Sequence, residues 1–319
     1  MRYAFAPMEG ITGYIYRNAH KKWFGGADVY YSPFLSPGTE KGFSSRELQD
    51  IDPENNRTIT LIPQILTNQA DLFLRAAERL EALGYQEVNL NLGCPSGTVV
   101  AKKKGSGFLA YPKELQEFLE EIYKKTPISV SIKTRIGKES PEEFGQILSI
   151  FNQYPIKELI IHPRIQKDMY KNSPNWDVFD MARRESVNPV SYNGDLFSVE
   201  AYQAFRERFL DIESVMLGRG ILRDPALFLK IRRNDLSEDF PEQKQQTKQL
   251  WEFHRQIYEG YQEIMSGDRN VLFKMKEIWF YLGESFPDCK KELKRIKKAE
   301  KKADYEAAVK SLFETRELV

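Results

Sequence analysis

The sequence predicts an α/β protein: a (β/α)8 TIM barrel followed by a C-terminal all-helical domain. Short apolar or β-branched runs alternate with amphipathic segments over roughly the first 235 residues, and this is the pattern of parallel strands joined by crossover helices. Eight such units in that length match a closed barrel, which typically takes roughly 250 residues. A doubly wound sheet is the alternative architecture, and it is disfavoured because no GxGxxG motif follows the first strand.

The eight expected strands cover residues 3–6, 28–31, 59–65, 87–91, 128–133, 158–162, 189–192 and 214–217. Helical patterns such as 68–83 and 112–125 lie between them. After Leu236 a polar segment with a proline leads into apolar residues at helical spacing, among them Trp251, Tyr258 and Tyr261. We therefore expect a barrel domain over residues 1–236 and a helical domain over residues 237–319.

Composition narrows the class of protein. An apolar content of 41% in 319 residues supports a large folded core. No run approaches the roughly 18 apolar residues of a membrane helix, and the start of the chain lacks a signal-peptide pattern, so we expect a cytoplasmic protein. The two cysteines, Cys94 and Cys289, are far apart and form no CxxC pair, which argues against a disulfide scaffold and a metal site.

The net charge of +1 argues against a general polyanion binder. Residues 290–302 nevertheless hold eight basic and two acidic side chains, and Lys102 begins a run of three lysines. Such runs are either solvated helix faces or contacts for an anionic partner, and charge alone leaves both interpretations open.

Polar residues occur at nearly every expected strand end, where a barrel of this kind carries its reactive groups. Lys133 ends an apolar run, and a lysine buried there needs an anionic or electron-rich partner, which favours a function. Gln64 could equally satisfy loop backbone, and Asn91 and Asn193 are typical turn formers. His162 is either a core residue or a hydrogen-bond donor to a ligand.

Two glycine-containing loops follow the seventh and eighth strands, at Gly194 and at Gly218-Arg219-Gly220. Loops at these places commonly bind phosphate through exposed backbone N–H groups, whereas a single glycine often marks only a tight turn. The presence of two such loops, one of them with an arginine, favours a phosphate.

Cys94 follows the fourth strand in a loop bounded by Gly93 and Pro95. A cysteine is most often a small buried apolar residue, but a thiol at the reactive end of a barrel can act as a proton donor or a nucleophile. No His or Asp neighbours it in sequence, which argues against a hydrolase and leaves acid catalysis open. His20 and His254 have no companions at metal-ligand spacing, so we expect them to be structural or surface residues.

Together these motifs resemble those of the tRNA-dihydrouridine synthases. The resemblance covers residues 4 to about 228 in the family's order, and the helical domain is similar to theirs in length and placement. It rests on the segments APMEGIT (6–12), PQ (63–64), NLNLGCP (89–95), KTR (133–135), HPR (162–164), NGD (193–195), GRG (218–220) and DP (224–225). The GCP of residues 93–95 is the most specific part.

The resemblance implies an FMN cofactor at the barrel mouth. Pro7, Met8 and Gln64 would contact the isoalloxazine ring, Lys133 would lie by its electron-accepting edge, and His162 would help to hold it. The loops that carry the FMN phosphate would contain Asn193, Gly194, Asp195, Gly218 and Arg219.

The resemblance also implies a reaction. NADPH would reduce FMN, N5 of the reduced flavin would pass hydride to C6 of a uracil, and the thiol of Cys94, the general acid, would protonate C5. Asn91 would line the uracil pocket. Because the uridine must leave its stack, the enzyme needs further contacts to tRNA. The candidates for these contacts are Arg135, Arg164, Lys102, Lys274, Lys276, Lys294 and Arg295. The enzyme is expected to be a monomer.

Two residues depart from the family pattern: Pro163 stands where glycine or alanine is usual, and Tyr192 places a bulky side chain near the expected flavin. Two other functions are kept as alternatives. An FMN-dependent dehydrogenase of a small (dihydro)pyrimidine would not need the basic helices, and an RNA-binding barrel without catalysis is disfavoured by the intact Cys94 and Lys133.

Overall fold

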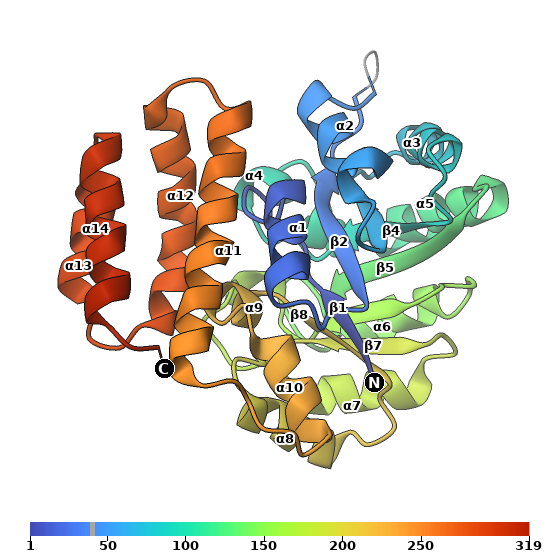
Figure 1. The fold of residues 1–319 in the computed structure, drawn as a ribbon. Coiled ribbons are helices and arrows are strands. Elements are labelled where there is room, and N and C mark those ends of the chain that lie inside the picture. The colour runs from blue at the N-terminus through green and yellow to red at the C-terminus, as the bar shows by residue number, and fades with distance from the viewer. Residues whose placement is uncertain (39–41, 319) are drawn as a thin grey trace. The chain divides into compact units, whose positions relative to one another are not determined.

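A computed structural model describes residues 1–38 and 42–318 of the chain. It contains a closed barrel of eight parallel strands in sequence order, in which β8 pairs with β1 (Figure 1). The strands are β1 (Arg2–Phe5), β2 (Val29–Leu35), β3 (Leu61–Ile65), β4 (Glu87–Leu92), β5 (Ser129–Arg135), β6 (Leu159–His162), β7 (Val190–Asn193) and β8 (Ser214–Leu217). The predicted (β/α)8 barrel is confirmed.

The expected strands differ from the observed ones by at most two residues at their ends, with β2 as the exception. The prediction ended β2 at Tyr31, before a serine and a proline, but the strand continues to Leu35 with a register shift between Tyr31 and Phe34. Pro33 has no N–H to donate to a neighbouring strand. The strand therefore passes the proline through an irregularity in the ladder, which residue preference alone would read as the end of the strand.

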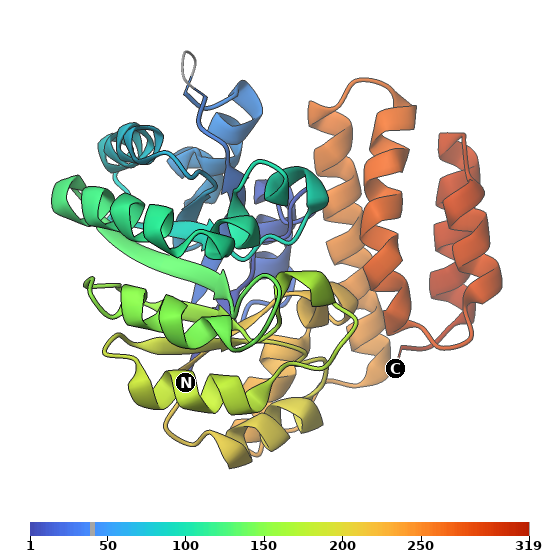
Figure 2. The same cartoon turned by 180° about the vertical axis from the view of Figure 1, so that it is seen from behind.

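The segments between the strands contain helices, which Figure 2 shows from the opposite side. They are α1 (Tyr14–Trp23), α2 (Ser45–Ile51), α3 (Ala70–Ala82), α4 (Gly97–Val100), α5 (Pro112–Lys125), α6 (Glu143–Phe151), α7 (Trp176–Glu185) and α8 (Val199–Arg208), with short 3-10 turns η1 (Pro53–Asn56), η2 (Gly105–Ala110) and η3 (Gln166–Asp168). After β8 come α9 (Arg219–Arg223), α10 (Leu227–Asp235), α11 (Gln243–Ile264), α12 (Asp268–Leu282), η4 (Gly283–Ser285), α13 (Lys290–Lys298) and α14 (Lys302–Thr315). The expected all-helical C-terminal region is present, and none of the described helices is long and apolar enough to span a membrane.

Alternation along the strands separates the barrel interior from the layer of helices outside it. Apolar residues from five strands form one interior cluster, which consists of Ala4, Ala6, Val29, Tyr31, Ile62, Ile160 and Met216. Because side chains two positions further along a strand share its face, Gln64 follows Ile62 on the inner face and His162 follows Ile160. The inner face thus changes from apolar to polar toward the carboxyl ends of the strands.

The described chain divides into two compact units. The barrel unit comprises residues 1–7, 28–38, 42–195 and 205–217, and the helical unit comprises residues 8–27, 196–204 and 218–318. The helical unit thus takes in α1, α9 and α10 as well as α11 to α14. The predicted division into independent domains at residue 236 stays a prediction.

In the helical unit, α1 packs on α11. The ring edge of Tyr16 contacts Phe253 with 5.3 Å between ring centroids, and the indole N–H of Trp23 donates to Oε1 of Gln256 at 2.7 Å. Gly260 of α11 allows the close approach, because a Cβ there would lie 2.9 Å from Ile15.

Candidate active site

Cys94 lies in the loop directly after β4, and Asn91 holds this loop through its side chain. The amide oxygen of Asn91 accepts hydrogen bonds from the backbone N–H groups of Gly93 at 3.0 Å and Cys94 at 2.9 Å. Cys94 itself is partly exposed, with a thiol outside any disulfide. The loop is therefore fixed on the barrel while the thiol stays accessible, as a proton donor requires.

The Asn91 amide belongs to a chain of buried side-chain hydrogen bonds across three strands. Its Nδ2 donates to Oε1 of Gln64 at 2.7 Å, and Nε2 of Gln64 donates to Oδ1 of Asn89 at 2.7 Å. Nδ2 of Asn89 in turn donates to Oγ of Ser131 at 3.0 Å. Gln64 is fully buried, so a side chain that could have satisfied loop backbone is instead the centre of a polar network, which sets the orientation of the Asn91 amide.

The Cys94 loop is also held from its outer side. The backbone N–H and the hydroxyl of Ser106 both donate to the Cys94 carbonyl, at 3.1 and 2.8 Å. Gly105 has a φ of +57°, and a Cβ at that position would lie 2.7 Å from the same carbonyl. The sequence analysis assigned no role to these residues, although a glycine in a left-handed conformation next to a reactive loop is the kind of signal that could have identified them.

Two long side chains fix the flanks of the loop. Nε of Arg135 donates to the Gly93 carbonyl at 3.1 Å, and Nε2 of Gln166 donates to the Pro95 carbonyl at 3.1 Å. Arg135 also donates to two further backbone carbonyls, of Ile165 at 2.8 Å and Met169 at 2.7 Å. Its guanidinium is thus buried and joins the loops after β4 and β6.

Lys133 pairs with Asn91 in the parallel register of β4 and β5, so the two residues lie side by side on the inner face of the barrel. Burial lowers the pKa of the Lys133 ammonium to about 7, the charge of Arg135 lowers it too, and Cys94 acts in the opposite direction. Within residues 1–38 and 42–318 no carboxylate forms an ion pair with Lys133. Such an amine is suited to stabilise negative charge on a bound molecule.

His162, at the end of β6, is buried and bonded to Arg164. Nη1 of Arg164 lies 3.0 Å from Nε2 of His162. Because a guanidinium has only donors, Nε2 must accept this bond. The ring proton of the neutral imidazole therefore lies on Nδ1, which makes that nitrogen the donor.

Arg164 is almost fully buried and forms a two-pronged ion pair with Asp195. Nη1 donates to Oδ1 of Asp195 at 2.9 Å and Nη2 donates to Oδ2, while Nε donates to the Asn172 carbonyl. All the described partners of this guanidinium lie within the protein. Arg164 thereby connects the loop after β6 to the loop after β7.

Tyr192 lies in β7 with its side chain directed away from the barrel interior, and its expected crowding of the flavin stays a prediction. Tyr192 alternates with the inward residues of β7, its ring stacks on Phe205 at 4.3 Å, and its hydroxyl accepts the indole N–H of Trp176 at 2.9 Å. A Cβ on Gly194 would lie 2.0 Å from the Tyr192 hydroxyl, so glycine is required there. Asn193 donates through Nδ2 to the Met216 carbonyl at 2.7 Å.

Three expected cofactor residues belong to the helical unit. Met8 begins a turn in which its N–H donates to Oγ1 of Thr12 at 2.8 Å. The preceding residue, Pro7, is the last residue of the segment 1–7 of the barrel unit. Gly218 is the N-cap of α9 and offers no side-chain cap to the first turn. The guanidinium of Arg219 lies 5.2 Å from the ring of Phe197.

The lysines expected to contact tRNA differ in how far the protein already uses them. Nζ of Lys274 donates to the Gly10 carbonyl and pairs with Glu277 at 2.9 Å. Nζ of Lys276 donates to the Ala299 carbonyl at 2.5 Å, at the C-cap of α13. Lys102 is exposed in the turn that follows α4, and its carbonyl accepts a bond from Asn68. Only part of this set has an ammonium available for an external anion.

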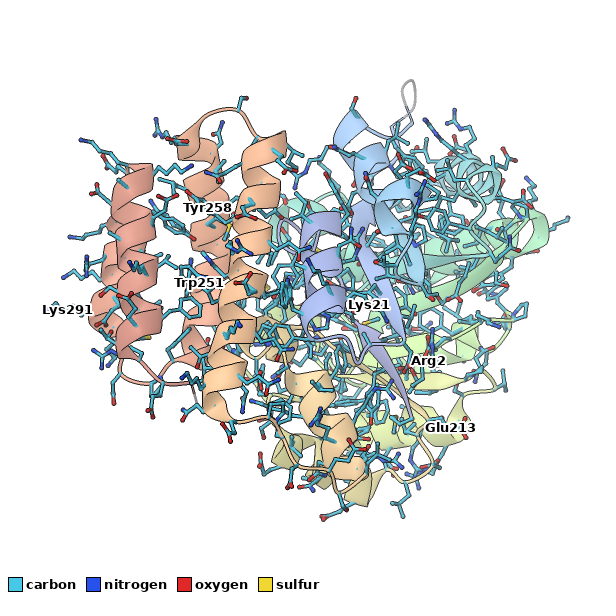
Figure 3. All side chains as sticks on the ribbon, in the orientation of Figure 1. Arg2, Lys21, Glu213, Trp251, Tyr258 and Lys291 are labelled. Atoms are coloured by element: carbon cyan, nitrogen blue, oxygen red, sulfur yellow. The ribbon has the colours of Figure 1, made fainter. Side chains whose placement is uncertain are left out.

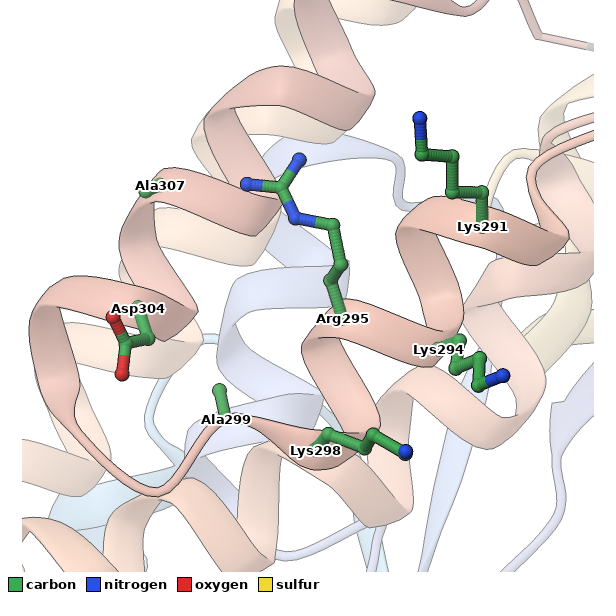
Figure 4. Close-up of a pocket in the computed structure, with 7 residues that line it drawn as sticks. All are labelled: Lys291, Lys294, Arg295, Lys298, Ala299, Asp304 and Ala307. Carbon is green, nitrogen blue, oxygen red and sulfur yellow. The ribbon is translucent and has the colours of Figure 1, made fainter.

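Lys294 and Arg295 are exposed and line a cavity of about 480 Å³ on α13 and α14 (Figure 4). Lys291, Lys298, Ala299, Asp304 and Ala307 complete its lining. Four cationic side chains and one carboxylate surround the space. The expected basic surface of residues 290–302 is therefore a face with a concavity.

His20 and His254 are buried inside the helical unit, which bears out the expectation of structural residues. Nε2 of His20 lies 3.0 Å from the Pro225 carbonyl, and Nε2 of His254 lies 2.7 Å from the Tyr305 hydroxyl. Within the described residues no group of three or more His, Cys, Asp or Glu side chains could hold a metal ion.

A closed parallel barrel with a cysteine, a lysine and a histidine at the carboxyl ends of its strands defines a TIM-barrel enzyme. A sequence model described as "Dihydrouridine synthase (Dus)" matches residues 4–315. The chain therefore belongs to the dihydrouridine synthase family, as the resemblance predicted.

Individual relatives agree with this assignment. The chain is 27% identical over 285 residues to tRNA-dihydrouridine synthase B of Shewanella oneidensis, covering 88% of this chain and 85% of that protein. It is 26% identical over 245 residues to a probable tRNA-dihydrouridine synthase of Staphylococcus aureus, covering 74% of this chain and 73% of the relative. A probable tRNA-dihydrouridine synthase 1 of Synechocystis sp. is 25% identical over 287 residues, covering 86% of this chain and 78% of the relative.

Solved structures with the same fold include two reductases. A 2-naphthoyl-CoA reductase complex matches with a TM-score of 0.55 and 12% identity, over 74% of this chain and 50% of that one. A morphinone reductase variant in complex with tetrahydroNAD matches with a TM-score of 0.51 and 12% identity, over 76% of this chain and 88% of that one. At this level of identity the likeness concerns the barrel fold.

Proposed function

We propose that this protein reduces a uridine of tRNA to 5,6-dihydrouridine, with FMN as the bound cofactor, NADPH as the reductant and Cys94 as the general acid. Membership of the dihydrouridine synthase family supports the reaction, and the names of the relatives support tRNA as the substrate. The observation that carries the proposal for this chain is the accessible Cys94 thiol, held by Asn91 beside the unpaired ammonium of Lys133.

The donors at the barrel mouth fit a flavin. Lys133 supplies an amine whose pKa is lowered to about 7, so it gains a proton readily when negative charge comes near. His162 supplies an imidazole at the end of β6 whose orientation is fixed by the bond from Arg164 to its Nε2. When bound and reduced by NADPH, FMN supplies the hydride that C6 of the uracil receives.

For the remaining FMN contacts, the proposal keeps the residues named from the sequence. Pro7, Met8 and Gln64 are assigned to the ring, and the loops after β7 and β8 are assigned to the phosphate. Gly194 supports the second assignment, since it is partly exposed and carries no side chain of its own. The phosphate residues are Asn193, Gly194, Asp195, Gly218 and Arg219.

Cys94 gives the proton to C5 of the uracil. Its backbone is held at both N–H and carbonyl, by Asn91 and Ser106, so only rotation of the side chain is needed to aim the thiol. Asn91 has one remaining amide N–H, since its oxygen accepts two bonds and its other N–H is donated to Gln64. We assign that N–H to the uracil, so one amide would align substrate and acid.

Arg135 and Arg164 are proposed to act near the uracil mainly by holding the loops, since the protein occupies their guanidinium groups. The exposed Lys102, Lys294 and Arg295 are proposed to bind phosphates of the tRNA. Lys274 and Lys276 are weaker candidates, because each already donates to a backbone carbonyl. We propose a monomer that acts in the cytoplasm, where tRNA is processed.

The test uses the purified protein with FMN, NADPH and an unmodified tRNA transcript. Nuclease fragments of the product are expected to show the mass gain of two hydrogens at a uridine. Cys94→Ala is expected to lose this reduction while retaining the flavin spectrum. If Cys94→Ala reduces the transcript at the wild-type rate, the assignment of the acid is wrong.

The same assay addresses the small-molecule alternative. Replacing the transcript by uracil or orotate is expected to give no NADPH consumption above the background without substrate. Charge reversal of Lys294 and Arg295 is expected to slow reduction of tRNA with the flavin content unchanged. Turnover of a free pyrimidine that these substitutions leave unaffected would favour the alternative.

A further inference from the structure

A second cavity of the helical unit, of about 600 Å³, lies along α11 and α14 and has no role in the function proposed above. It is lined by Gln243, Lys244, Thr247, Lys248, Trp251, Lys310, Phe313, Glu314, Arg316 and Glu317. Lys244, Lys248 and Trp251 are spaced four and three residues apart, so they share one face of α11. A volume of this size is within the range of small-ligand sites.

Trp251, which is labelled in Figure 3, lines this cavity and is partly exposed. Its ring packs edge-on against Phe313 with 5.1 Å between centroids. The other three tryptophans donate their indole N–H, Trp23 to Gln256, Trp176 to Tyr192 and Trp279 to Tyr305. In the described part of the chain, Trp251 is the tryptophan whose N–H has no protein acceptor, so its polar edge is available to a ligand.

The charges around the indole are predominantly positive. Four cations, Lys244, Lys248, Lys310 and Arg316, face two carboxylates in the lining. Lys310 pairs with Glu314 at 3.7 Å, and Arg316 pairs with Glu292 at 3.0 Å. Lys244 and Lys248 have no ion-pair partner among residues 1–38 and 42–318. An aromatic face beside two unpaired ammonium groups suits a ligand that combines a flat heterocycle with a negative charge.

We propose that this cavity, the Trp251 pocket, binds one nucleotide of an RNA, with its base against the indole and its phosphates near Lys244 and Lys248. The proposal rests on the proposed function in taking the RNA to be the tRNA substrate. The neighbouring position of a second cavity lined by cations favours an RNA over a free nucleotide. Ala307 lines the cavity that contains Lys294 and Arg295, whereas Lys310 lines the Trp251 pocket. These two residues are three positions apart on α14, so they are neighbours on its surface.

The test compares the affinities of full-length variants for an unmodified tRNA transcript. Trp251→Leu removes the aromatic face and is expected to weaken binding at least about fivefold, since stacking of one base is worth about 1–3 kcal/mol. Trp251→Phe keeps an aromatic ring and is expected to bind within about twofold of the wild type. A loss of the same size in both variants would overturn the stacking role.

The charge arm uses Lys244→Glu with Lys248→Glu, and the matched control is Lys124→Glu with Lys157→Glu, on exposed lysines of the barrel unit. Loss of up to two phosphate contacts is expected to lower the slope of log Kd against log salt by about 1 to 2. The control pair carries the same change in net charge and is expected to lower the slope of log Kd against log salt less than the Lys244 and Lys248 pair does. Equal losses in the two pairs would overturn a local contact.

The source of the nucleotide is tested by titrating the wild type and Trp251→Phe with free 5′-UMP and 5′-AMP while following indole fluorescence. No saturable change at micromolar concentration is expected. A saturable change that Trp251→Phe abolishes would assign the pocket to a free nucleotide and overturn the RNA assignment.

Turnover separates this proposal from the proposed function. At saturating tRNA, Trp251→Leu is expected to reduce uridine at the wild-type rate with a raised KM. If no variant and no wild type reduces tRNA, the proposed function fails, while the ranking of tRNA affinities still decides on the pocket. If reduction is normal and every variant binds tRNA like the wild type, the pocket proposal alone fails.

Discussion

The two buried histidines of the helical unit make its stability sensitive to mild acid. Burial lowers the pKa of His20 and of His254 to about 3 each. Burial is what keeps both imidazoles neutral, since the contact of Nε2 of His20 with the Pro225 carbonyl at 3.0 Å acts in the opposite direction. Nε2 of His254 lies 2.7 Å from the Tyr305 hydroxyl, whose oxygen receives the indole N–H of Trp279 at 2.9 Å.

The sign and size follow from proton binding in the two states. An exposed histidine in the unfolded chain titrates near pH 6.5, so above that pH both states are neutral and the histidines contribute no pH dependence. Between pH 6.5 and about 3 the unfolded chain binds more protons than the folded protein, and stability falls as the pH falls. Each histidine removes up to about 1.4 kcal/mol per pH unit, nearly all of it below pH 6.5, so we expect a loss of roughly 3 kcal/mol between pH 7.5 and 5.5 for the two.

The assay is urea unfolding at a series of pH values, followed by tryptophan fluorescence, since Trp251 and Trp279 both lie in the helical unit. His254→Gln can still accept a bond from Tyr305 but does not titrate, and it is expected to halve the loss. His20→Gln together with His254→Gln is expected to abolish most of it. A loss below about 1 kcal/mol in the wild type, or one that the double variant leaves unchanged, would refute the reasoning.

Three further predictions concern the candidate active site. Asp195→Ala leaves the buried Arg164 guanidinium without its carboxylate and is expected to cost about 3–5 kcal/mol in urea unfolding, whereas Arg164→Met with Asp195→Leu is expected to cost less than Asp195→Ala alone. Gly105→Ala places a Cβ on left-handed backbone, 2.7 Å from the Cys94 carbonyl. It is expected to lose about 1–3 kcal/mol of unfolding free energy and to slow single-turnover reduction. The control is Gly97→Ala, because a Cβ there would meet no atom within 4 Å. Lys133→Met is expected to lower the reduction potential of bound FMN. In the wild type, the contribution of Lys133 to this potential is expected to weaken as the pH rises through about 7, because the ammonium then loses its proton. A reduction potential that is the same in both proteins at pH 6 would contradict this role.

The sequence was sufficient to predict the barrel, and it also selected candidate reactive groups near the strand ends. Alternation of apolar runs and amphipathic segments predicted eight strands, because the period of side-chain burial is a local property of each segment. The rule that barrel enzymes carry their groups at the carboxyl ends of strands then selected Cys94, Lys133 and His162. In the structure Cys94 follows β4, Lys133 lies two residues before the end of β5, and His162 ends β6.

Only the tertiary structure decided what those side chains are bonded to. Asn91 looked like a turn former and Gln64 like a loop residue, but the register of β3, β4 and β5 joins them into one buried chain of hydrogen bonds. The same applies to Lys274, which the sequence offers as a cation for RNA and the fold bonds to the Gly10 carbonyl 264 residues away. A residue type states which bonds a side chain can make, whereas the partner depends on contacts between segments that are distant in sequence, and only the closed fold brings those segments together.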